Sequence, residues 1–453
     1  MPISIPSFKA YDIRGRLPDQ LNADIAYRIA NATAQFLDAK RVVVGRDIRL
    51  SSAELADAVC RGLTDAGVEV LDIGLGGTEM VYFATGSLKA DGGIMVTASH
   101  NPKDYNGLKI VREDARPISG DSGLADIRAL AESDDRLIAA TAGSVTETSI
   151  DTDYIGHLLT YVDANALKPI KIAVNAGNGG AGLVLDQLEP SLPFEFVKLH
   201  HAPDGDFPNG VPNPMLTENR KSTSSCVTGH SADMGIAWDG DFDRCFFFDE
   251  QGAFIEGYYI VGLLADTLLS NESGAGVVHD PRLTWSTVEI VEQRGGRVIE
   301  SKSGHSFMKQ VMREENALYG GEMSAHHYFR DFYFCDSGMI PWLLIAELLC
   351  KTGKPLSTLV SERIAKFPTS GEINRRVDDA TAVMESLWTH YQPGALSSSQ
   401  VDGISVEFAD WRFNLRASNT EPVIRLNVES RGDKGLMASK TQELLTVIGG
   451  EPA

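Results

Sequence analysis

The chain has few cysteines, and they do not form a short sequence motif. The chain has 453 residues and five cysteines, Cys60, Cys226, Cys245, Cys335 and Cys350, with no Cys-X-X-Cys pair among them. This odd and scattered set predicts neither a disulfide framework nor a zinc site. We therefore expect reduced thiols, as in the cytoplasm.

Long apolar runs are missing as well. The best candidate, residues 340–350 (IPWLLIAELLC), is interrupted by Glu347 and is shorter than the roughly 20 apolar residues that cross a bilayer. The start of the chain, MPISIPSFKAYDIRG, lacks the apolar run behind a basic segment that marks a secretory signal. We expect a cytoplasmic protein without a membrane partner.

Basic residues are outnumbered. The chain has 41 Lys and Arg against 62 Asp and Glu, which gives a formal net charge of −21. Nucleic acids and anionic membranes select surfaces rich in Lys and Arg, so neither is expected as a partner. With 43% hydrophobic and 23% charged residues, the chain can build packed cores. At about 150 residues per domain, three or four domains are expected.

The sequence does contain a repeated α/β pattern. Short apolar strands alternate with polar or Gly-rich loops and amphipathic helices as far as about residue 365. In one such unit, Ser51 and Glu54 have the spacing of a capping box before a helix, and Gly67 lies where that helix should end. Alternating strands such as residues 403–416 then predict a separate α+β domain. The predicted domains are 1–149, 150–252, 253–366 and 367–453.

Three predicted strands run directly into polar loops. These segments are residues 93–102 (GIMVTASHNP), 235–244 (GIAWDGDFDR) and 317–327 (ALYGGEMSAHH). In open α/β sheets, ligands bind at the carboxyl ends of the strands. The three loops could therefore face one cleft.

The second of these loops carries three alternating carboxylates. Asp239, Asp241 and Asp243 would repel one another by roughly 3 kcal/mol per pair at about 6 Å, and a divalent cation would remove that repulsion. An all-oxygen ligand set favours Mg²⁺. A calcium loop of the EF-hand type is disfavoured because Arg244 stands where Gly is needed. A solvated turn remains the plain alternative.

The first loop is predicted to fold back through a turn at Asn106–Gly107, so that Lys109 could approach the hydroxyl of Ser99. A hydroxyl in that position could carry a covalent group. A serine hydrolase is disfavoured because no Gly-X-Ser-X-Gly elbow surrounds Ser99. The alternative is a serine that only caps a turn with Asn101.

The third loop offers Glu322, Ser324 and His326 after two glycines. A carboxylate accepts two hydroxyl hydrogen bonds at once, which suits the neighbouring hydroxyls of a sugar. An ordinary surface acid and a structural histidine, at His326 or His327, are equally compatible with these residues.

A fourth polar segment lies in the C-terminal part, where Arg416 is followed by small polar residues and Arg425. Tight polar loops expose backbone N–H groups, and Arg adds a fork that matches phosphate oxygens. This segment predicts an anion site, with a plain turn as the alternative. The small polar residues are Ser418, Asn419 and Thr420.

A Gly-rich stretch after the strand 171–176 fits the dinucleotide motif Gly-X-Gly-X-X-Gly. The next apolar segment, residues 194–200, ends in Lys198 and His200 where an acidic ribose partner would be expected. We therefore interpret these glycines as residues that pack a strand against a helix.

Taken in order, the motifs TASHNP, DGDFDRC, GGEMSAHH and RASNTEP resemble those of the α-D-phosphohexomutases, most closely the bacterial phosphomannomutases. The resemblance also includes FKAYDIRG (8–15) and GRDIRLSS (45–52), so it extends over nearly the whole chain. It implies three α/β domains of related topology and a C-terminal α+β domain around a central cleft. Phe242 replaces a Gly that is common elsewhere in the family, a feature shared by phosphomannomutases of nucleotide-sugar pathways.

The resemblance also implies roles for individual residues. Ser99 would carry the phosphoryl group and, with the three aspartates, would bind Mg²⁺. His100, Lys109 and Arg14 would be the other catalytic residues. The residues implied to bind substrate are Tyr11, Arg244, His305, Glu322, Ser324, His326, Arg416, Ser418, Asn419, Thr420 and Arg425.

The activity implied is the interconversion of mannose 6-phosphate and mannose 1-phosphate through a phosphoserine and a hexose 1,6-bisphosphate, for GDP-mannose synthesis. A phosphoglucomutase or a dual-specificity mutase is the main alternative, and a phosphoglucosamine mutase is less expected because Met323 follows the mannose/glucose pattern. A metal-dependent phosphatase and a non-enzymatic sugar-phosphate binding protein are alternatives of other classes. The expected assembly is a monomer or a homodimer.

Overall fold

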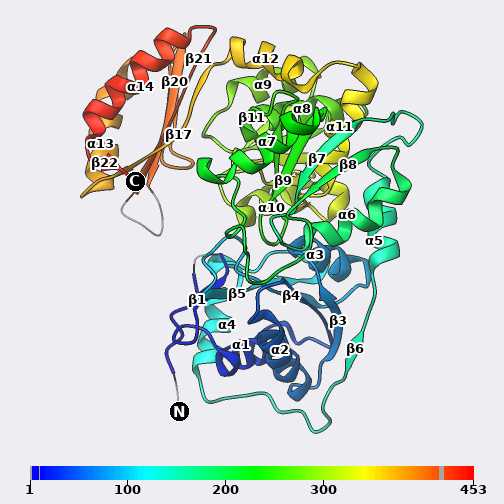
Figure 1. The fold of residues 1–453 in the computed structure, drawn as a ribbon. Coiled ribbons are helices and arrows are strands. Elements are labelled where there is room, and N and C mark those ends of the chain that lie inside the picture. Colours follow the sequence, from blue (N-terminus) through cyan, green and yellow to red (C-terminus); the bar gives the residue numbers. More distant parts are fainter. Residues whose placement is uncertain (1–2, 10, 418–422) are drawn as a thin grey trace. The chain divides into compact units, whose positions relative to one another are not determined.

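The structure is a computed structural model, and it describes residues 3–9, 11–417 and 423–453 (Figure 1). The chain divides into two compact units, one formed by Met1–Phe254 with His326–Gly353 and the other by Ile255–Ala325 with Lys354–Ala453.

The first unit contains two sheets and a short hairpin. Its helices are α1 (Ala23–Leu37), α2 (Ser52–Asp65), α3 (Thr78–Ser87), α4 (Leu124–Glu132), α5 (Asp151–Leu159), α6 (Ala181–Leu188), α7 (Lys221–His230) and α11 (Ile340–Thr352). Its strands are β1 (Ile13–Arg16), β2 (Arg41–Arg46), β3 (Glu69–Leu75), β4 (Gly92–Val96), β5 (Tyr105–Arg112), β6 (Val145–Glu147), β7 (Lys171–Asn175), β8 (Glu195–Leu199), β9 (Met234–Trp238), β10 (Cys245–Phe248), β15 (His327–Phe329) and β16 (Cys335–Asp336), with β11 (Phe254–Ile255) at its boundary.

The two sheets of this unit share one topology. The first has the order β1-β5-β4-β2-β3-β6 and the second β11-β10-β9-β7-β8. In both, a central strand lies parallel to a neighbour on each side, and the third strand of the set pairs with an antiparallel strand. Strands β4 and β9 are therefore equivalent, and each runs into one of the polar loops predicted to carry chemistry.

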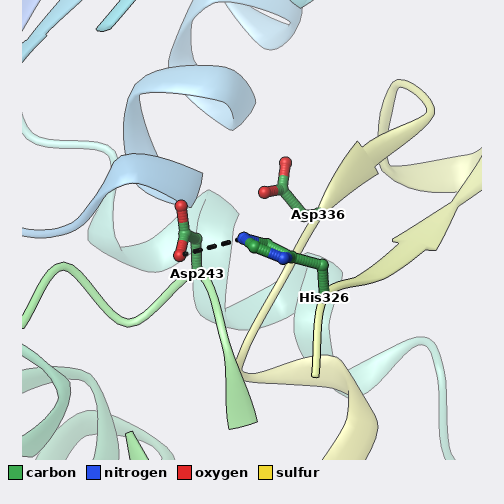
Figure 2. A group of neighbouring side chains, drawn as sticks. All are labelled: Asp243, His326 and Asp336. Atoms are coloured by element: carbon green, nitrogen blue, oxygen red, sulfur yellow. Dashed lines mark ion pairs between the residues drawn. The ribbon is translucent and has the colours of Figure 1, made fainter. Parts of the chain in front are cut away.

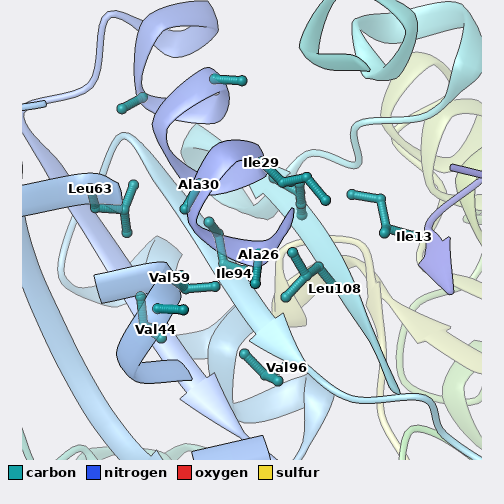
Figure 3. Packing of buried hydrophobic residues seen from close by; sticks show 14 of the residues in the cluster. Ile13, Ala26, Ile29, Ala30, Val44, Val59, Leu63, Ile94, Val96 and Leu108 are labelled. Carbon is teal, nitrogen blue, oxygen red and sulfur yellow. The ribbon is translucent and has the colours of Figure 1, made fainter. Parts of the chain in front are cut away.

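Alternation along the strands separates the two faces of the first sheet. Val44, Ile94 and Leu108 point into one core together with Ala30 and Leu63 of helices α1 and α2 (Figure 3). The opposite face packs against α3, because a side chain at Gly45 or at Gly93 would collide with Val81. Such two-sided cover is typical of a mainly parallel sheet.

Helix α2 begins at Ser52, as the pattern predicts, but the predicted capping box is absent. Ser51 makes no side-chain capping bond to the helix, and its Oγ instead accepts a hydrogen bond of 2.8 Å from Asn106. Gly67 follows the end of the helix with φ of +85°, a conformation in which glycine has no steric penalty.

The second unit combines a parallel sheet with an antiparallel one. Its helices are α8 (Gly257–Leu269), α9 (Trp285–Gln293), α10 (His305–Glu314), α12 (Leu356–Lys366), α13 (Ala380–Tyr391) and α14 (Lys434–Ile448). Its strands are β12 (Gly276–His279), β13 (Arg297–Glu300), β14 (Tyr319–Gly321), β17 (Thr369–Arg376), β18 (Ser397–Ser399), β19 (Ile404–Glu407), β20 (Trp411–Ala417), β21 (Val423–Ser430) and β22 (Glu451–Pro452).

Strand β12 lies parallel to β13 on one side and to β14 on the other, so this set repeats the order found around β2 and β7. The antiparallel sheet has the order β18-β19-β20-β21-β17-β22, and α13 and α14 cover one of its faces (Figure 1). The predicted fold class is therefore confirmed: α/β domains of related topology are followed by an α+β domain. In the described part of the chain, no helix has the length and apolar character needed to cross a membrane.

Close packing of α1 on α2 yields a test of this core. A methyl group added at Gly62 of α2 would lie 2.3 Å from the carbonyl oxygen of Tyr27, whereas one added at Gly156 of α5 would meet nothing within 4 Å. We expect Gly62→Ala to destabilise the protein by about 1–3 kcal/mol through overpacking. Gly156→Ala should leave it unchanged or stabilise it by up to about 1 kcal/mol.

Thermal denaturation of both variants checks this prediction, since the same substitution is made inside two helices. A melting temperature for Gly62→Ala equal to that of the unmodified chain would contradict the packing described here.

Candidate active site

The loop that follows β4 is held in place by one buried arginine. The Arg49 guanidinium donates hydrogen bonds to four carbonyl oxygens of this loop, those of Ser99 (2.9 Å), Asn101 (2.6 Å), Pro102 (2.8 Å) and Tyr105 (3.0 Å). A planar fork with five donors can satisfy such a set, whereas Lys could not. Sequence analysis assigned Arg49 no role, because its partners lie about fifty residues away in the chain.

Ser99 is further fixed by its own backbone. Its N–H donates to Thr97 Oγ1 at 2.9 Å, and the hydroxyl of Thr97 donates to Asp47 at 2.7 Å. The residue adopts φ of +49°, an uncommon conformation for a residue with a side chain. The surrounding contacts therefore hold this loop in a local conformation that few sequences would adopt unaided.

The aspartate loop that follows β9 packs directly against the serine loop. A side chain at Gly240 would lie 2.6 Å from the carbonyl oxygen of Ser99, so only glycine allows this approach. Phe242 is fully buried, and its ring lies against Gly77 and Gly180. The bulky residue that resembles the phosphomannomutase pattern thus anchors the loop that holds the aspartates.

The serine hydroxyl meets the carboxylates. Ser99 Oγ donates to Asp239 Oδ2 at 2.9 Å, and His100 Nδ1 lies 3.0 Å from the same hydroxyl. Burial and the positive charges of Arg244 and Arg14 hold the pKa of His100 well below its ordinary value, so this imidazole is neutral. The structure therefore brings together Ser99, His100 and the aspartate loop.

Two cations compensate the buried aspartates. Lys109 Nζ donates to Asp241 at 2.6 Å and to Asp243 at 2.5 Å, while Arg244 donates to Asp239 through Nε (2.9 Å) and Nη2 (2.6 Å). Burial alone would lower the pKa of Lys109, but Asp241 and Asp243 raise it above its ordinary value. Lys109 is therefore a charged ammonium group.

Arg14 joins the same region from β1. Its Nε donates to Asp12 at 2.7 Å and its Nη1 donates to Asn101 of the serine loop at 2.6 Å. Tyr11 lies just before this strand.

Thr78, at the start of α3, was not singled out by the sequence analysis. Its hydroxyl donates a hydrogen bond of 2.5 Å to Asp241.

The three aspartates fit a hard divalent cation. One oxygen of each is engaged by the donors named above, while Asp239 Oδ1, Asp241 Oδ1 and Asp243 Oδ1 are buried and have no hydrogen-bond partner among the described residues. The candidate ligand atoms all lie within 4.8 Å of one another. Burial and Asp241 raise the pKa of Asp243 well above its ordinary value. Such a donor set of oxygen atoms suits Mg²⁺.

His326 lies beside this loop and within the same unit. Figure 2 shows its ring between the carboxyl groups of Asp243 and Asp336, and its Nε2 is 3.8 Å from Asp243 Oδ1. The three side chains offer ligand atoms within 4.8 Å of one another. Asp336, on β16, is a member of the site that sequence analysis did not find.

A second group of predicted residues lies in the second unit, after β12 and β14. Arg282 makes a bidentate pair with Asp280 (3.0 and 2.7 Å), and its Nη2 lies 3.4 Å from Ser324 Oγ and 3.6 Å from Glu322 Oε1. Glu322 also accepts the N–H of Gly304, next to His305 at the start of α10, at 2.8 Å.

Neither Arg282 nor Asp280 was predicted from the sequence. The available signal was the segment HDPR (279–282) at the end of β12, a fourth strand that ends in polar residues.

The predicted anion site of the C-terminal part is described only in part. Arg416 and Arg425 lie opposite each other on β20 and β21. Ser418, Asn419 and Thr420 lie outside the described residues, so the structure places only the two arginines of this group.

Comparison with known proteins identifies the family. Models described as phosphoglucomutase/phosphomannomutase match in four parts: alpha/beta/alpha domain I at residues 6–137, domain II at 152–252, domain III at 256–367 and the C-terminal domain at 372–445. The four matches together extend over most of the chain.

Individual relatives agree. A protein of Xanthomonas campestris pv. campestris (strain B100) named "Phosphohexose mutases" is 58% identical over 448 residues, which is 99% of this chain and 100% of that protein. A "Phosphomannomutase" of Salmonella typhimurium (strain LT2) is 57% identical over 448 residues, covering 97% of this chain and 98% of the relative. The crystal structure of a phosphoglucomutase/phosphomannomutase family protein from Burkholderia thailandensis has a TM-score of 0.89 and 32% identity, with 99% of each chain covered.

The unpartnered aspartate oxygens predict metal-dependent stability. A cation that binds only the folded state stabilises it by mass action, so adding Mg²⁺ should raise the melting temperature by a few degrees. Asp241→Asn should abolish this shift, because it removes a ligand charge. Asp249→Asn, which removes a buried carboxylate outside the aspartate group, should lower the melting temperature but preserve the shift.

Differential scanning calorimetry with and without Mg²⁺ measures these shifts. Equal shifts in Asp241→Asn and in the unmodified chain would show that these aspartates do not hold the metal.

Proposed function

This chain belongs to the phosphoglucomutase/phosphomannomutase family, and we propose that it interconverts mannose 6-phosphate and mannose 1-phosphate through a phosphoserine at Ser99 and a hexose 1,6-bisphosphate. Membership makes it an enzyme, a phosphohexose mutase of the isomerase class. The observation that carries the proposal is the contact of 2.9 Å between Ser99 Oγ and Asp239 beside a buried group of three aspartates.

The proposed reaction consists of two phosphoryl transfers. A sugar hydroxyl attacks the phosphorus of phospho-Ser99, the bond from phosphorus to Oγ breaks, and the bisphosphate forms. After the bisphosphate turns over, Ser99 Oγ attacks the other phosphate and the isomeric monophosphate is released. Each transfer moves one proton from the attacking hydroxyl to the oxygen that leaves. Lys109, which Asp241 and Asp243 hold as an ammonium group, would donate to the leaving oxygen, and a neighbour would accept the proton of the attacking hydroxyl.

The local geometry supports these roles. The neutral ring of His100 lies in direct contact with Ser99 Oγ. Lys109 and Arg244 place positive charges beside the buried carboxylates. Asp239, Asp241 and Asp243 would hold Mg²⁺ together with an oxygen of the phosphoserine. When bound, the metal would neutralise charge on the transferring phosphoryl group.

Further predicted residues would bind the rest of the substrate. Under this proposal Glu322 and Ser324 contact sugar hydroxyls, and Arg282 holds both side chains in place. His305 and His326 would be further substrate contacts. The phosphate that is not reacting would be bound by Arg416, Ser418, Asn419, Thr420 and Arg425.

Under this proposal the enzyme is cytoplasmic and has four domains, 1–149, 150–252, 253–366 and 367–453. It acts as a monomer or a homodimer and supplies mannose 1-phosphate for GDP-mannose synthesis. A dual-specificity mutase is the second candidate, because one of the closely similar relatives carries the broader name "Phosphohexose mutases". Mannose and glucose differ only at C2, and the residues around Glu322 do not by themselves choose between them.

The phosphoserine proposal predicts the effect of one substitution. Ser99→Ala should abolish detectable conversion of mannose 1-phosphate to mannose 6-phosphate, because no group can then carry the phosphate, while the melting temperature stays nearly unchanged. The matched control Ser87→Ala, at an exposed residue at the end of α3, should retain full activity.

Intact mass measurement with peptide mapping should find one phosphate on Ser99 that is lost when substrate is added. Turnover by Ser99→Ala would refute the phosphoserine role, and steady release of inorganic phosphate without isomer formation would favour a phosphatase instead.

Substrate preference is predicted separately. The catalytic efficiency, kcat/KM, should be higher for mannose 1-phosphate than for glucose 1-phosphate when both are assayed with catalytic amounts of the matching 1,6-bisphosphate. A strong preference for glucose 1-phosphate would replace the mannose assignment with a phosphoglucomutase, and equal efficiencies would support the dual-specificity candidate.

A further inference from the structure

One partly buried carboxylate in the second unit contacts three arginines. Glu372 of β17 lies 3.3 Å from Arg416 Nη2, 3.5 Å from Arg425 Nη1 and 3.6 Å from Arg282 Nη1. The arginines come from β20, β21 and the loop after β12, so the carboxylate is the point at which three separate segments meet.

The sheet geometry explains why a carboxylate is favourable at this position. Arg416 and Arg425 lie directly opposite each other on adjacent antiparallel strands, a position in which like charges destabilise a sheet. Leu415, Ile424 and Leu426 beside them point into the core under α13 and α14. Because side chains alternate, the two arginines lie on the other face, away from these helices.

An irregularity in β17 delivers Glu372 to that face. The pairing of β17 with β21 shifts between Thr369 and Glu372, and Gly371 has φ of +66°. A bulge of this kind re-aims the following side chain. Burial would raise the pKa of Glu372, but the charges of Arg282, Arg416 and Arg425 lower it, so the group is an ionised carboxylate.

The arginines still have binding capacity left. The side chains of Arg416 and Arg425 keep 15% and 32% of their surface exposed, against 12% for Glu372. Their Nε atoms are buried donors without a hydrogen-bond partner among the described residues. An anion that approaches the exposed edges would find guanidinium groups that are already oriented and only partly neutralised.

We propose that Glu372 is a positioning residue that acts as an internal counter-anion: it holds Arg416, Arg425 and Arg282 in place and competes with the phosphate of the substrate for Arg416 and Arg425. The inference rests on the proposed function in that Arg416 and Arg425 bind the phosphate that is not reacting. When the bisphosphate leaves to turn over, Arg416 and Arg425 pair with Glu372 again. Arg416 also lies 3.6 Å from Asp402, so Glu372 is the carboxylate that the two arginines share.

This competition has a defined kinetic consequence. An interaction that binds ground states more tightly, without an equal gain in the transition state, slows turnover. A carboxylate that weakens the binding of the departing phosphate therefore lowers the affinity for phosphate and raises the turnover rate. A carboxylate with only a structural role would instead be expected to lose both affinity and stability when it is neutralised.

The first test measures binding without turnover. In a Ser99→Ala background, Glu372→Gln removes the charge and keeps the shape, and titration calorimetry should show mannose 1-phosphate bound about tenfold more tightly, or about 1.4 kcal/mol. Inorganic phosphate should show a gain in the same direction. Glu372→Asp, which withdraws the carboxylate by one methylene group, should have an intermediate affinity and serves as the decisive variant if Glu372→Gln does not fold.

The second test measures turnover in the otherwise unmodified enzyme. Glu372→Gln should lower both KM and kcat, and Glu372→Asp should restore kcat in part. The matched control is Glu407→Gln on β19 of the same sheet, where the carboxylate accepts a hydrogen bond from Trp285 (2.9 Å) and lies 3.6 Å from Arg431. It should leave phosphate affinity within twofold of the unmodified protein.

Unchanged or weaker binding of inorganic phosphate by both Glu372 variants would overturn the inference. Failure of the proposed function is a separate result: it would be seen as absence of mutase turnover by the unmodified chain. The titrations with inorganic phosphate still decide on Glu372 in that case, because they do not depend on the reaction.

Discussion

The arrangement of the first unit depends on the compensation of three carboxylates buried within a few ångströms of one another. Lys109 reaches them from β5 and Arg244 from the aspartate loop itself, so the charge pairs tie one sheet to the other. Removing one partner of a buried pair leaves an uncompensated charge and costs about 3–5 kcal/mol. The same pairs fix the position of Ser99, because its hydroxyl donates to the carboxylate that Arg244 holds.

Repetition of one topology explains why the polar loops occur where they do. The serine loop follows β4, the aspartate loop follows β9, and the segment with Glu322 and Ser324 follows β14. Each of these strands lies on the same side of an equivalent central strand, namely β2, β7 and β12. A carboxyl edge is where a parallel sheet offers free loops, so the same position in each copy became available for chemistry.

Much of this could be predicted from the sequence, and the omissions share a cause. Strand positions and the aspartate loop follow from apolar runs and polar segments close together in the chain. The turn predicted at Asn106–Gly107 was wrong, because both residues lie inside β5 and pair with β1. Lys109, predicted to approach Ser99, instead donates to Asp241 and Asp243. Arg49, Thr78 and Glu372 carry no such local signal, because their partners lie far away in sequence or depend on a bulge. The capping box at Ser51 was wrong for the same reason: Asn106, more than fifty residues away, engages the serine side chain. The roles assigned to the site residues stay predictions.

Both groups of charged residues follow one physical rule. Unpaired charges are costly to bury, so a site prepared for an ionic ligand must be neutralised by the protein itself until the ligand arrives. In the first unit Lys109 and Arg244 occupy one oxygen of each aspartate and leave the other available. In the second unit Glu372 pairs with Arg416 and Arg425, whose side chains remain partly exposed. Partial neutralisation of this kind keeps the charged groups of a site oriented while part of each group remains available to a ligand of opposite charge.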